Sequence, residues 1–273
     1  MPELPEVETV RRGLEGALKG AVIRKVILRR KNLRIPFPEG MAKRLEGQKI
    51  ISIDRRAKYL LFYLDGVDVL ISHLGMTGRF ICHPTQVAGS GHDHVIIELG
   101  DGRTLIYNDA RRFGLMTITP KNALKTHPLL AEMGPEPFDK AFSATYLKTE
   151  LAKRKIPIKV ALMDQKLVVG VGNIYASEAL FLAKINPQKP ANKIPQNTIE
   201  TLIISIQKTL QNAIDSGGSS LRDFLHVSGE AGYFQHHFNV YGRKGKPCFQ
   251  CGTPIRGMGL SGRSTFYCPL CQG

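Results

Sequence analysis

Residues 248–271 read CFQCGTPIRGMGLSGRSTFYCPLC and carry four of the five cysteines of the chain. The cysteines form two Cys-x-x-Cys pairs separated by sixteen residues. Each pair can present two thiolates to one tetrahedral ion, and the residues between the pairs can form a hairpin. We therefore predict one structural Zn²⁺ bound by Cys248, Cys251, Cys268 and Cys271, in preference to four free thiols. So short a segment buries little apolar surface, so zinc should supply much of its folding free energy.

Two arginines, Arg256 and Arg263, lie between the cysteine pairs and would project from this hairpin. A zinc-stiffened hairpin that carries arginine is suited to contact DNA phosphates. A solvated turn explains the same pattern equally well. The segment alone therefore leaves both interpretations open.

The charge balance of the whole chain favours a nucleic-acid partner. The 273 residues include 38 Lys and Arg against 23 Asp and Glu, a formal net charge of +15. Such an excess is typical of proteins that bind nucleic acids, although a basic surface can also serve solubility.

The first ten residues, MPELPEVETV, lack the basic and apolar regions of a signal peptide. The sequence also contains no apolar run of about 18 residues, the length that a membrane-spanning helix needs. We therefore expect a cytoplasmic protein without membrane association. Disulfides are rare in that compartment, which supports metal binding by the paired cysteines and leaves Cys82 without an assigned role.

Hydrophobic periodicity predicts an α+β protein with two domains. Apolar residues at helical spacing predict a helix over residues 3–18. Short segments rich in β-branched or aromatic residues predict strands of a sandwich or barrel at 22–28, 50–54, 59–64, 69–74, 94–99, 104–107 and 115–118. Beyond them, helices are expected near 143–154, 157–165, 174–185 and 196–215, followed by a long loop at 219–247. The predicted domains are 1–119, a Pro-rich linker at 120–140, a helical domain at 141–235 and the zinc segment at 236–273.

The N-terminus carries an unusual group of residues. If Met1 is removed, Pro2 exposes a secondary amine that can attack an aldehydic sugar carbon, as lysine does in Schiff-base enzymes. Glu3 and Glu6 are spaced to share a helix face near that amine, where one could transfer a proton and the other orient the site. The plainer interpretation is an ordinary helix start, in which Pro and Glu are common.

Three further segments combine residue types that suit DNA binding. Residues 169–175, VGVGNIY, place glycines before a helix with Asn173 as the expected N-cap, which would suit an anion or simply cap the helix. Residues 72–79 and 108–114 combine an apolar side chain with arginine, as proteins that unstack bases do. A single Met or Phe is nevertheless more often buried in a core. His92 and His94 form a His-x-His pair that we interpret as polar contacts in preference to metal ligands.

These motifs together resemble the bacterial formamidopyrimidine-DNA glycosylases, repair enzymes for 8-oxoguanine and ring-opened purines. The resemblance covers essentially the whole chain and rests on several specific motifs. They are PELPEVET at 2–9, SHLGMTGRF at 72–80, NDARRFG at 108–114, LVVGVGNIYASEAL at 167–180, VYGRKGKPC at 240–248 and the four cysteines. The resemblance implies an N-terminal β-sandwich flanked by helices and a C-terminal helical domain with a helix-two-turn-helix motif and a zinc finger. Duplex DNA would lie between the two domains.

The resemblance also implies a role for each matching residue. Pro2 would be the nucleophile on the deoxyribose C1′, Glu3 the general acid/base, and Lys58, in RRAKYL, an active-site lysine near the phosphates of the lesion. Glu6 and Lys159 would support the active site. The implied DNA contacts are His73, Met76, His92, Arg111, Phe113, Asn173, Tyr241 and Arg263, of which Met76, Arg111 and Phe113 would fill the gap left by the extruded nucleotide. A loop near 217–235 would cover the lesion.

The activity implied is base excision followed by cleavage of the abasic strand. The damaged nucleotide would leave the duplex, Pro2 would displace the base and form an imine, and elimination at both phosphates would leave a one-nucleotide gap. The implied partner is duplex DNA with oxidised bases or abasic sites, bound by a monomer, with zinc as the only metal and no nicotinamide or flavin.

Two other functions remain compatible with parts of the sequence. Endonuclease VIII-like glycosylases, which act on oxidised pyrimidines, typically begin PEGPE, whereas this chain begins PELPE after Met1 and contains ARRFG. A zinc-finger DNA-binding protein without catalysis makes no use of Pro2, Glu3 and Lys58 together. We therefore favour oxidised purines as substrates.

Overall fold

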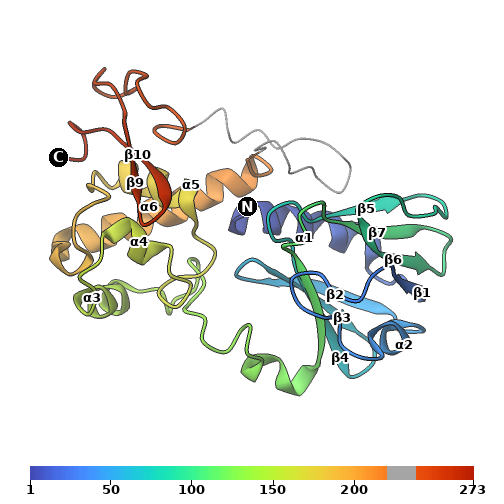
Figure 1. The fold of residues 1–273 in the computed structure, drawn as a ribbon. Coiled ribbons are helices and arrows are strands. Elements are labelled where there is room, and N and C mark those ends of the chain that lie inside the picture. Colours follow the sequence, from blue (N-terminus) through green and yellow to red (C-terminus); the bar gives the residue numbers. More distant parts are fainter. Residues whose placement is uncertain (220–237) are drawn as a thin grey trace. The chain divides into compact units, whose positions relative to one another are not determined.

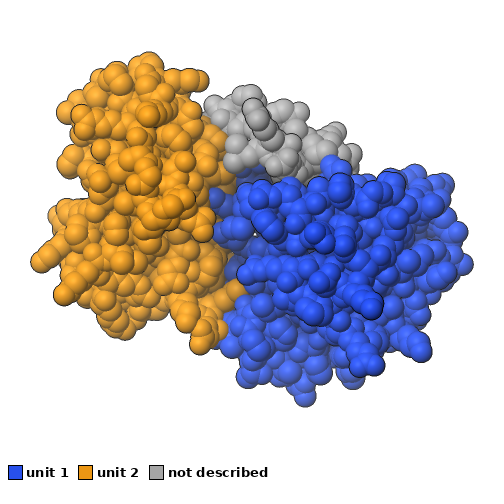
Figure 2. Space-filling model, in the orientation of Figure 1, with its two compact units in different colours: residues 1–131, 217–233 blue, residues 132–216, 234–273 orange. Residues whose placement is uncertain are grey.

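The computed structural model describes residues 1–219 and 238–273 (Figure 1). The described residues form two compact units, distinguished by colour in Figure 2. Unit 1 contains residues 1–131 and 217–219, and unit 2 contains residues 132–216 and 238–273. The division falls inside the segment 120–140, which the sequence predicts as a linker.

Helix α1 (Leu4–Leu18) opens unit 1. Its apolar residues recur every three or four positions, so one face of the helix is apolar and buried, as predicted. Pro5 lies in the first turn, where the missing N–H breaks no helical hydrogen bond. The residues of this buried face are Leu4, Val7, Val10, Leu14 and Leu18.

The other helices and strands in the described part of unit 1 are two four-stranded antiparallel sheets and two short helices. The first sheet has the order β1 (Ile23–Leu28), β6 (Asp93–Leu99), β7 (Thr104–Asn108) and β5 (Arg79–His83). The second has the order β2 (Ile50–Arg56), β3 (Tyr59–Leu64), β4 (Asp68–His73) and β8 (Leu115–Pro120). Side chains from both sheets, from α1 and from α2 (Met41–Leu45) share one apolar core, which confirms the β-sandwich flanked by helices.

Strand β5 is the one strand of this sandwich that the sequence pattern did not predict. It lies at the edge of its sheet and pairs only with β7. Of its five residues only Phe80 is fully buried, so it lacks the apolar alternation that identifies the other strands. The predicted linker is likewise not structureless, because it contains the 3₁₀ helix η1 (Lys121–Thr126).

Unit 2 is helical around its own apolar core and ends in a hairpin. Its helices are α3 (Ala144–Ala152), α4 (Ile158–Leu162), α5 (Asn173–Leu182), η2 (Ala191–Lys193) and α6 (Gln196–Asp215). The hairpin consists of β9 (Arg256–Leu260) and β10 (Arg263–Tyr267), which places it between the two cysteine pairs as expected. No helix within residues 1–219 or 238–273 combines the length and hydropathy needed to cross a bilayer.

Two expectations for unit 2 need comment. Gly172, and not Asn173, is the N-cap of α5, because the amide oxygen of Asn173 accepts a hydrogen bond from Lys159 and is not used by the backbone. The expected lesion-covering loop at 217–235 lies outside the described residues except for 217–219. These three residues belong to unit 1, although the sequence places them in the helical domain, because Ser219 is hydrogen-bonded to Glu6 on α1.

Candidate active site

The N-terminus of α1 holds two buried carboxylates next to Pro2. Glu3 is the N-cap residue, and its side chain accepts a hydrogen bond from the backbone N–H of Glu6. In return, Glu6 Oε2 accepts from the Glu3 N–H at 2.8 Å, which completes a capping box. Both side chains are nearly inaccessible, at 3% and 2% exposure, and Pro2 is buried beside them.

The other carboxylate oxygen of Glu6 binds Ser219, a residue far away in the sequence. Glu6 Oε1 accepts hydrogen bonds from Ser219 N at 2.8 Å and Ser219 Oγ at 2.9 Å. Both carboxylate oxygens of Glu6 are therefore occupied by donors of the protein. This arrangement suits a residue that orients the site.

Lys58 lies in the turn between β2 and β3 and is buried, with 6% of its surface exposed. The turn consists of Ala57 and Lys58, between the paired residues Arg56 and Tyr59. Strand β3 places Tyr59 opposite His73 on β4, and the two rings lie 4.8 Å apart. The predicted residues Lys58 and His73 therefore meet at one end of the second sheet.

The hydrogen bonding of His73 determines its tautomer. Its Nδ1 accepts a hydrogen bond from the Gly75 N–H at 2.9 Å, so the proton of the neutral ring lies on Nε2. Burial and the positive charges of Lys58 and Arg34 lower the pKa of His73 to about 4. At neutral pH His73 is therefore an uncharged N–H donor, which can still bind a phosphate oxygen.

The depressed pKa of His73 predicts a loss of stability in mild acid. Between pH 6.5 and pH 4 the unfolded chain binds a proton that the folded chain does not, so stability falls as the pH falls through this window. Through His73 alone, lowering the pH from about 7 to about 5 should reduce the free energy of unfolding by about 2 kcal/mol. His73→Asn keeps an acceptor for the Gly75 N–H but does not titrate, so its unfolding midpoint should depend less on pH. An unchanged pH dependence would show that other groups are responsible.

The two loops that carry Met76, Arg111 and Phe113 are locked together beneath their tips. Asp109 is fully buried. Its Oδ1 accepts a hydrogen bond from Thr77 Oγ1 at 2.5 Å, and its Oδ2 accepts one from the Gly114 N–H at 2.8 Å. Thr77 Oγ1 in turn accepts from the Arg111 N–H at 3.1 Å. These bonds hold both loops in fixed register while the side chains at the tips stay accessible.

Two glycines, Gly75 and Gly114, allow these two loops to lie so close together. Gly75 has a positive φ of 65°, and a Cβ there would lie 2.3 Å from the backbone of Phe113. A Cβ at Gly114 would lie 1.7 Å from the hydroxyl oxygen of Tyr107. At the surface, the Arg111 guanidinium stacks on the Phe113 ring at 4.7 Å, and 45% of Phe113 is exposed. Met76 is half-buried.

His92 is exposed, and its ring centroid lies 6.4 Å from that of His94. His94 Nε2 is hydrogen-bonded to the carbonyl oxygen of Asp109 at 2.9 Å. The only candidate metal-binding group among the described residues consists of the four C-terminal cysteines, so the pair of histidines is not part of one. His94 is thus a polar contact within unit 1, whereas the DNA contact expected of His92 stays a prediction.

In unit 2, Lys159 joins three elements from a buried position. Its ammonium donates to Asn173 Oδ1 at 2.7 Å, to Thr265 Oγ1 at 2.8 Å and to the Ser264 carbonyl at 3.0 Å. Lys159 is only 1% exposed. The lysine therefore ties α4 to the start of α5 and to strand β10 of the hairpin.

Asn173 and Tyr241 lie next to this lysine, whereas Arg263 is exposed at the start of β10. The Asn173 side-chain amide donates to Tyr241 Oη at 3.4 Å. Glu178, which the sequence did not single out, accepts from the backbone N–H groups of residues 239–241 and so fixes the segment that carries Tyr241. Two predicted DNA contacts, Asn173 and Tyr241, are thus brought together in unit 2, and the third, Arg263, lies at the start of the strand that also binds Lys159.

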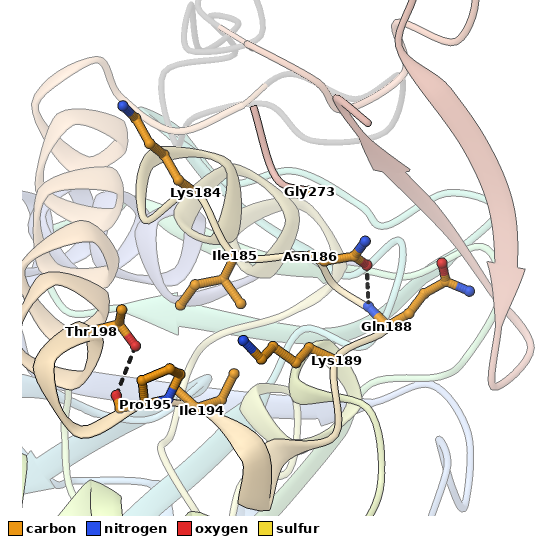
Figure 3. A pocket seen from close by; sticks show the side chains of 9 residues that line it. All are labelled: Lys184, Ile185, Asn186, Gln188, Lys189, Ile194, Pro195, Thr198 and Gly273. Atoms are coloured by element: carbon orange, nitrogen blue, oxygen red, sulfur yellow. Dashed lines mark hydrogen bonds between the residues drawn. The ribbon is translucent and has the colours of Figure 1, made fainter. Parts of the chain in front are cut away.

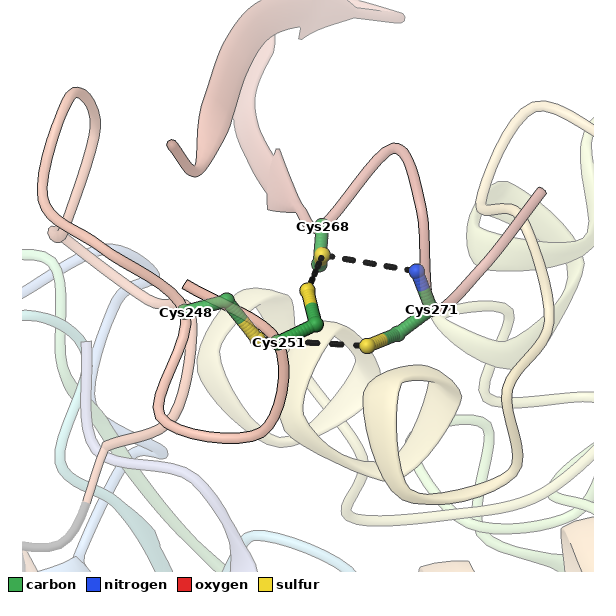
Figure 4. Close-up of side chains that lie close together, drawn as sticks. All are labelled: Cys248, Cys251, Cys268 and Cys271. Carbon is green, nitrogen blue, oxygen red and sulfur yellow. Dashed lines mark hydrogen bonds between the residues drawn. The ribbon is translucent and has the colours of Figure 1, made fainter. Parts of the chain in front are cut away.

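The four cysteines of unit 2 converge as the spacing predicts (Figure 4). All four Sγ atoms lie within 4.8 Å of one another, with Cys251 and Cys268 at 3.4 Å and Cys248 and Cys271 at 3.9 Å. A tetrahedral ZnS₄ centre with Zn–S bonds of about 2.3 Å has sulfur atoms about 3.8 Å apart. The cluster therefore fits a structural Zn²⁺ with four protein ligands.

A separate cavity of about 390 Å³ in unit 2 contains none of these side chains (Figure 3). Its lining includes Ile185 and Ile194 with the exposed Lys184 and Lys189. The candidate site is defined by side-chain chemistry and hydrogen bonding, and not by this cavity.

Models of known protein families match three successive parts of the chain. The formamidopyrimidine-DNA glycosylase N-terminal domain matches residues 1–116, the H2TH domain of the same enzymes matches 133–225, and a zinc finger found in FPG and IleRS matches 245–273. The chain belongs to the formamidopyrimidine-DNA glycosylase family. The four-cysteine cluster is the zinc finger of this family.

Individual family members resemble the chain over its full length. A formamidopyrimidine-DNA glycosylase of Dinoroseobacter shibae is 48% identical, with 100% of both chains covered. The Lactococcus lactis enzyme in complex with DNA containing an abasic site has a TM-score of 0.92 at 38% identity, covering 99% of each chain. A MutM structure with DNA containing carbocyclic 8-oxo-G has a TM-score of 0.91, also at 38% identity and 99% coverage of each chain.

Proposed function

We propose that this chain removes oxidised purines from duplex DNA and then cleaves the abasic strand through a covalent intermediate on Pro2. The observation that carries the proposal is the burial of Pro2 beside Glu3 at the start of α1, in a chain that matches the glycosylase family from end to end. Family members crystallised with abasic or 8-oxo-G DNA support the choice of substrate. The curated relatives are bacterial, so we place the proposed activity in the bacterial cytoplasm. We further propose that the chain acts as a monomer.

The reaction begins with the amine of Pro2 after removal of Met1. A free α-amino group has a pKa near 8, so a useful fraction is unprotonated at neutral pH. Its lone pair attacks the deoxyribose C1′, the bond from C1′ to the base breaks, and a proton supplied by Glu3 neutralises the departing charge. The C1′–O4′ bond then breaks as the amine proton passes to O4′, which opens the sugar ring and leaves an iminium ion between Pro2 and C1′.

Strand cleavage follows from the electron-withdrawing iminium. Loss of a proton from C2′ allows the 3′ phosphate to leave, and a second elimination releases the 5′ phosphate. Lys58 and His73, at the end of the second sheet, provide an ammonium and a neutral N–H donor for phosphates at the lesion. Water then hydrolyses the iminium ion, which releases the sugar fragment as an aldehyde and regenerates the Pro2 amine.

The DNA backbone is bound through basic and polar groups of both units. In this proposal His73, His92, Asn173, Tyr241 and Arg263 contact phosphates, while Met76, Arg111 and Phe113 enter the duplex. The net charge of +15 supports strong electrostatic attraction to DNA.

Binding to DNA should therefore weaken steeply as the salt concentration rises. Replacing Arg263 by Ala should reduce the slope of log K against log salt by about one, since one phosphate contact is lost. The affinity is measured by fluorescence anisotropy on a lesion-containing duplex at four or more salt concentrations. An affinity independent of salt would contradict the proposed binding mode, and an unchanged slope would exclude Arg263 from it.

Phe113 should contribute to base extrusion more than to chemistry. Phe113→Ala should slow excision from an intact lesion duplex more than cleavage of a preformed abasic site, which needs less unstacking. Phe138→Ala is the matched control. Phe138 is similarly exposed, at 43%, and lies outside the two loops that carry Met76, Arg111 and Phe113. Equal losses of rate on both substrates would mean that Phe113 contributes to the packing of the protein and not to base extrusion.

A cleavage assay tests the proposed substrate class. Duplexes carrying 8-oxoguanine, an oxidised pyrimidine or no lesion are incubated with the purified protein, and the strands are separated on denaturing gels. We expect fastest cleavage at 8-oxoguanine. Preferential cleavage at the oxidised pyrimidine would indicate an endonuclease VIII-like specificity, and binding without cleavage would reject the enzymatic function.

A further inference from the structure

Glu8, on the second turn of α1, lies at the centre of a cluster of arginines. Its carboxylate accepts hydrogen bonds from Arg11 at 3.0–3.2 Å, from Arg12 Nε at 3.0 Å and from Arg55 Nε at 3.1 Å. Burial alone would raise the pKa of Glu8, but the three arginines outweigh it and lower that pKa. Glu8 is therefore ionised throughout the neutral range, and its ion pairs are well shielded, with 13% of the side chain exposed.

Arg55 connects this carboxylate to the turn that carries Lys58. While its Nε donates to Glu8, its Nη1 donates to the carbonyl oxygen of Ala57 at 2.9 Å. Only 12% of the Arg55 side chain is exposed. One guanidinium thus spans from helix α1 to the backbone immediately before Lys58.

The turn itself needs such support. Ala57 has a φ of 54°, in the left-handed region where glycine is favoured at the first position of a two-residue hairpin turn. An alanine there is strained, and the hydrogen bond from Arg55 to its carbonyl helps to hold that conformation. A change in the Ala57 backbone would redirect Lys58, the next residue.

Farther along its length, helix α1 is also hydrogen-bonded to β2, the edge strand of the second sheet. Arg11 Nη1 donates to the Ile53 carbonyl at 3.1 Å, and the Ile53 N–H donates to the Glu15 carboxylate. Strand β2 is an edge strand, so these groups face away from β3 and are available to the helix. The helix with Pro2 at its start and the turn with Lys58 are therefore joined by a continuous series of hydrogen bonds within unit 1.

We propose that Glu8 and Arg55 are positioning residues that fix the Lys58 ammonium relative to the N-terminus of α1, an inference that rests on the function proposed above. Arginine is required, because Nε and Nη1 of one planar group reach two acceptors at once. A lysine has a single nitrogen at the end of a flexible chain and holds the geometry less well.

A double-mutant cycle separates positioning from general stability. Single-turnover excision of 8-oxoguanine is measured for the wild type, Arg55→Ala, Lys58→Ala and the double variant, each at a temperature where unfolding curves show it to be folded. Arg55→Ala should lower the excision rate at least about tenfold with little change in DNA affinity. In the Lys58→Ala background the same change should cost less than about twofold, because the group it positions is already gone.

Two further variants and one control variant test the same link. Glu8→Gln keeps side-chain size and Arg55→Lys keeps the positive charge, and both should show intermediate losses. Arg12→Ala removes a more exposed partner of Glu8, at 54% exposure, and should not affect excision. Additive effects of Arg55→Ala and Lys58→Ala, or equal losses for Arg12→Ala and Arg55→Ala, would overturn the proposal. Wild-type protein that fails to excise 8-oxoguanine would instead reject the proposed function.

Discussion

Replacing Glu3 by Gln should lower the rate of 8-oxoguanine excision by about 10²–10⁴, the usual contribution of a general acid or base. The variant should still form a borohydride-trapped complex with a preformed abasic site, because an open aldehyde needs no departing base to be protonated. The side-chain carbonyl of Gln can still accept the hydrogen bond from the Glu6 N–H, so the start of α1 should remain folded. Single-turnover kinetics on the two substrates measure both effects.

Glu39→Gln provides the control for this experiment. Glu39 is an exposed carboxylate of the same unit, and its replacement changes the net charge by the same amount. Its excision rate should match the wild type. Equal loss of excision and trapping in Glu3→Gln would show that Glu3 supports the structure of the site and does not transfer a proton.

Removing zinc should abolish tight DNA binding while leaving unit 1 folded. Cys268 is fully buried, and the hairpin between the cysteine pairs supplies Thr265 and Ser264 to the Lys159 ammonium. Structural zinc supplies about 10–16 kcal/mol of apparent folding free energy in small zinc fingers, which this segment has no large core to replace. Cys268→Ser should therefore lose stoichiometric zinc and bind lesion DNA much more weakly.

The fifth cysteine gives a matched control for zinc. Cys82 is half-buried on β5 in unit 1, so Cys82→Ser should retain zinc and DNA affinity. Zinc is measured by elemental analysis and affinity by anisotropy. Wild-type protein that contains no stoichiometric zinc when freshly purified, or a Cys268→Ser variant with normal affinity, would contradict this account.

Patterns within a single element predicted much of this fold. The spacing of Val7, Val10 and Leu14 follows one helix face, and the two Cys-x-x-Cys pairs specify a metal cluster, so both were predictable from local sequence. Strand β5 was missed because only Phe80 is fully buried on that edge strand. The N-cap of α5 was misplaced by one residue because Asn173 bonds to a lysine from another helix.

Contacts between elements were beyond the reach of sequence patterns. Nothing in the spacing indicates that Asp109 bonds to Thr77 or that Glu178 holds residues 239–241. Lys159 was predicted only through the family resemblance, and its three hydrogen bonds to α5 and β10 depend on tertiary structure. The side chains with proposed chemical roles could be predicted from the sequence, whereas most of the groups that hold them in place could not.

The central claim is that the amine of Pro2 is the nucleophile. Processed protein lacking Met1 is mixed with an 8-oxoguanine duplex and borohydride, which reduces an iminium to a stable amine, and the cross-linked peptide is identified by mass spectrometry. A form that retains Met1 is treated in parallel. The account predicts a cross-link at Pro2 in the processed protein and none in the form that keeps Met1. A cross-link at Lys58 or Lys159, or undiminished trapping with Met1 in place, would contradict it.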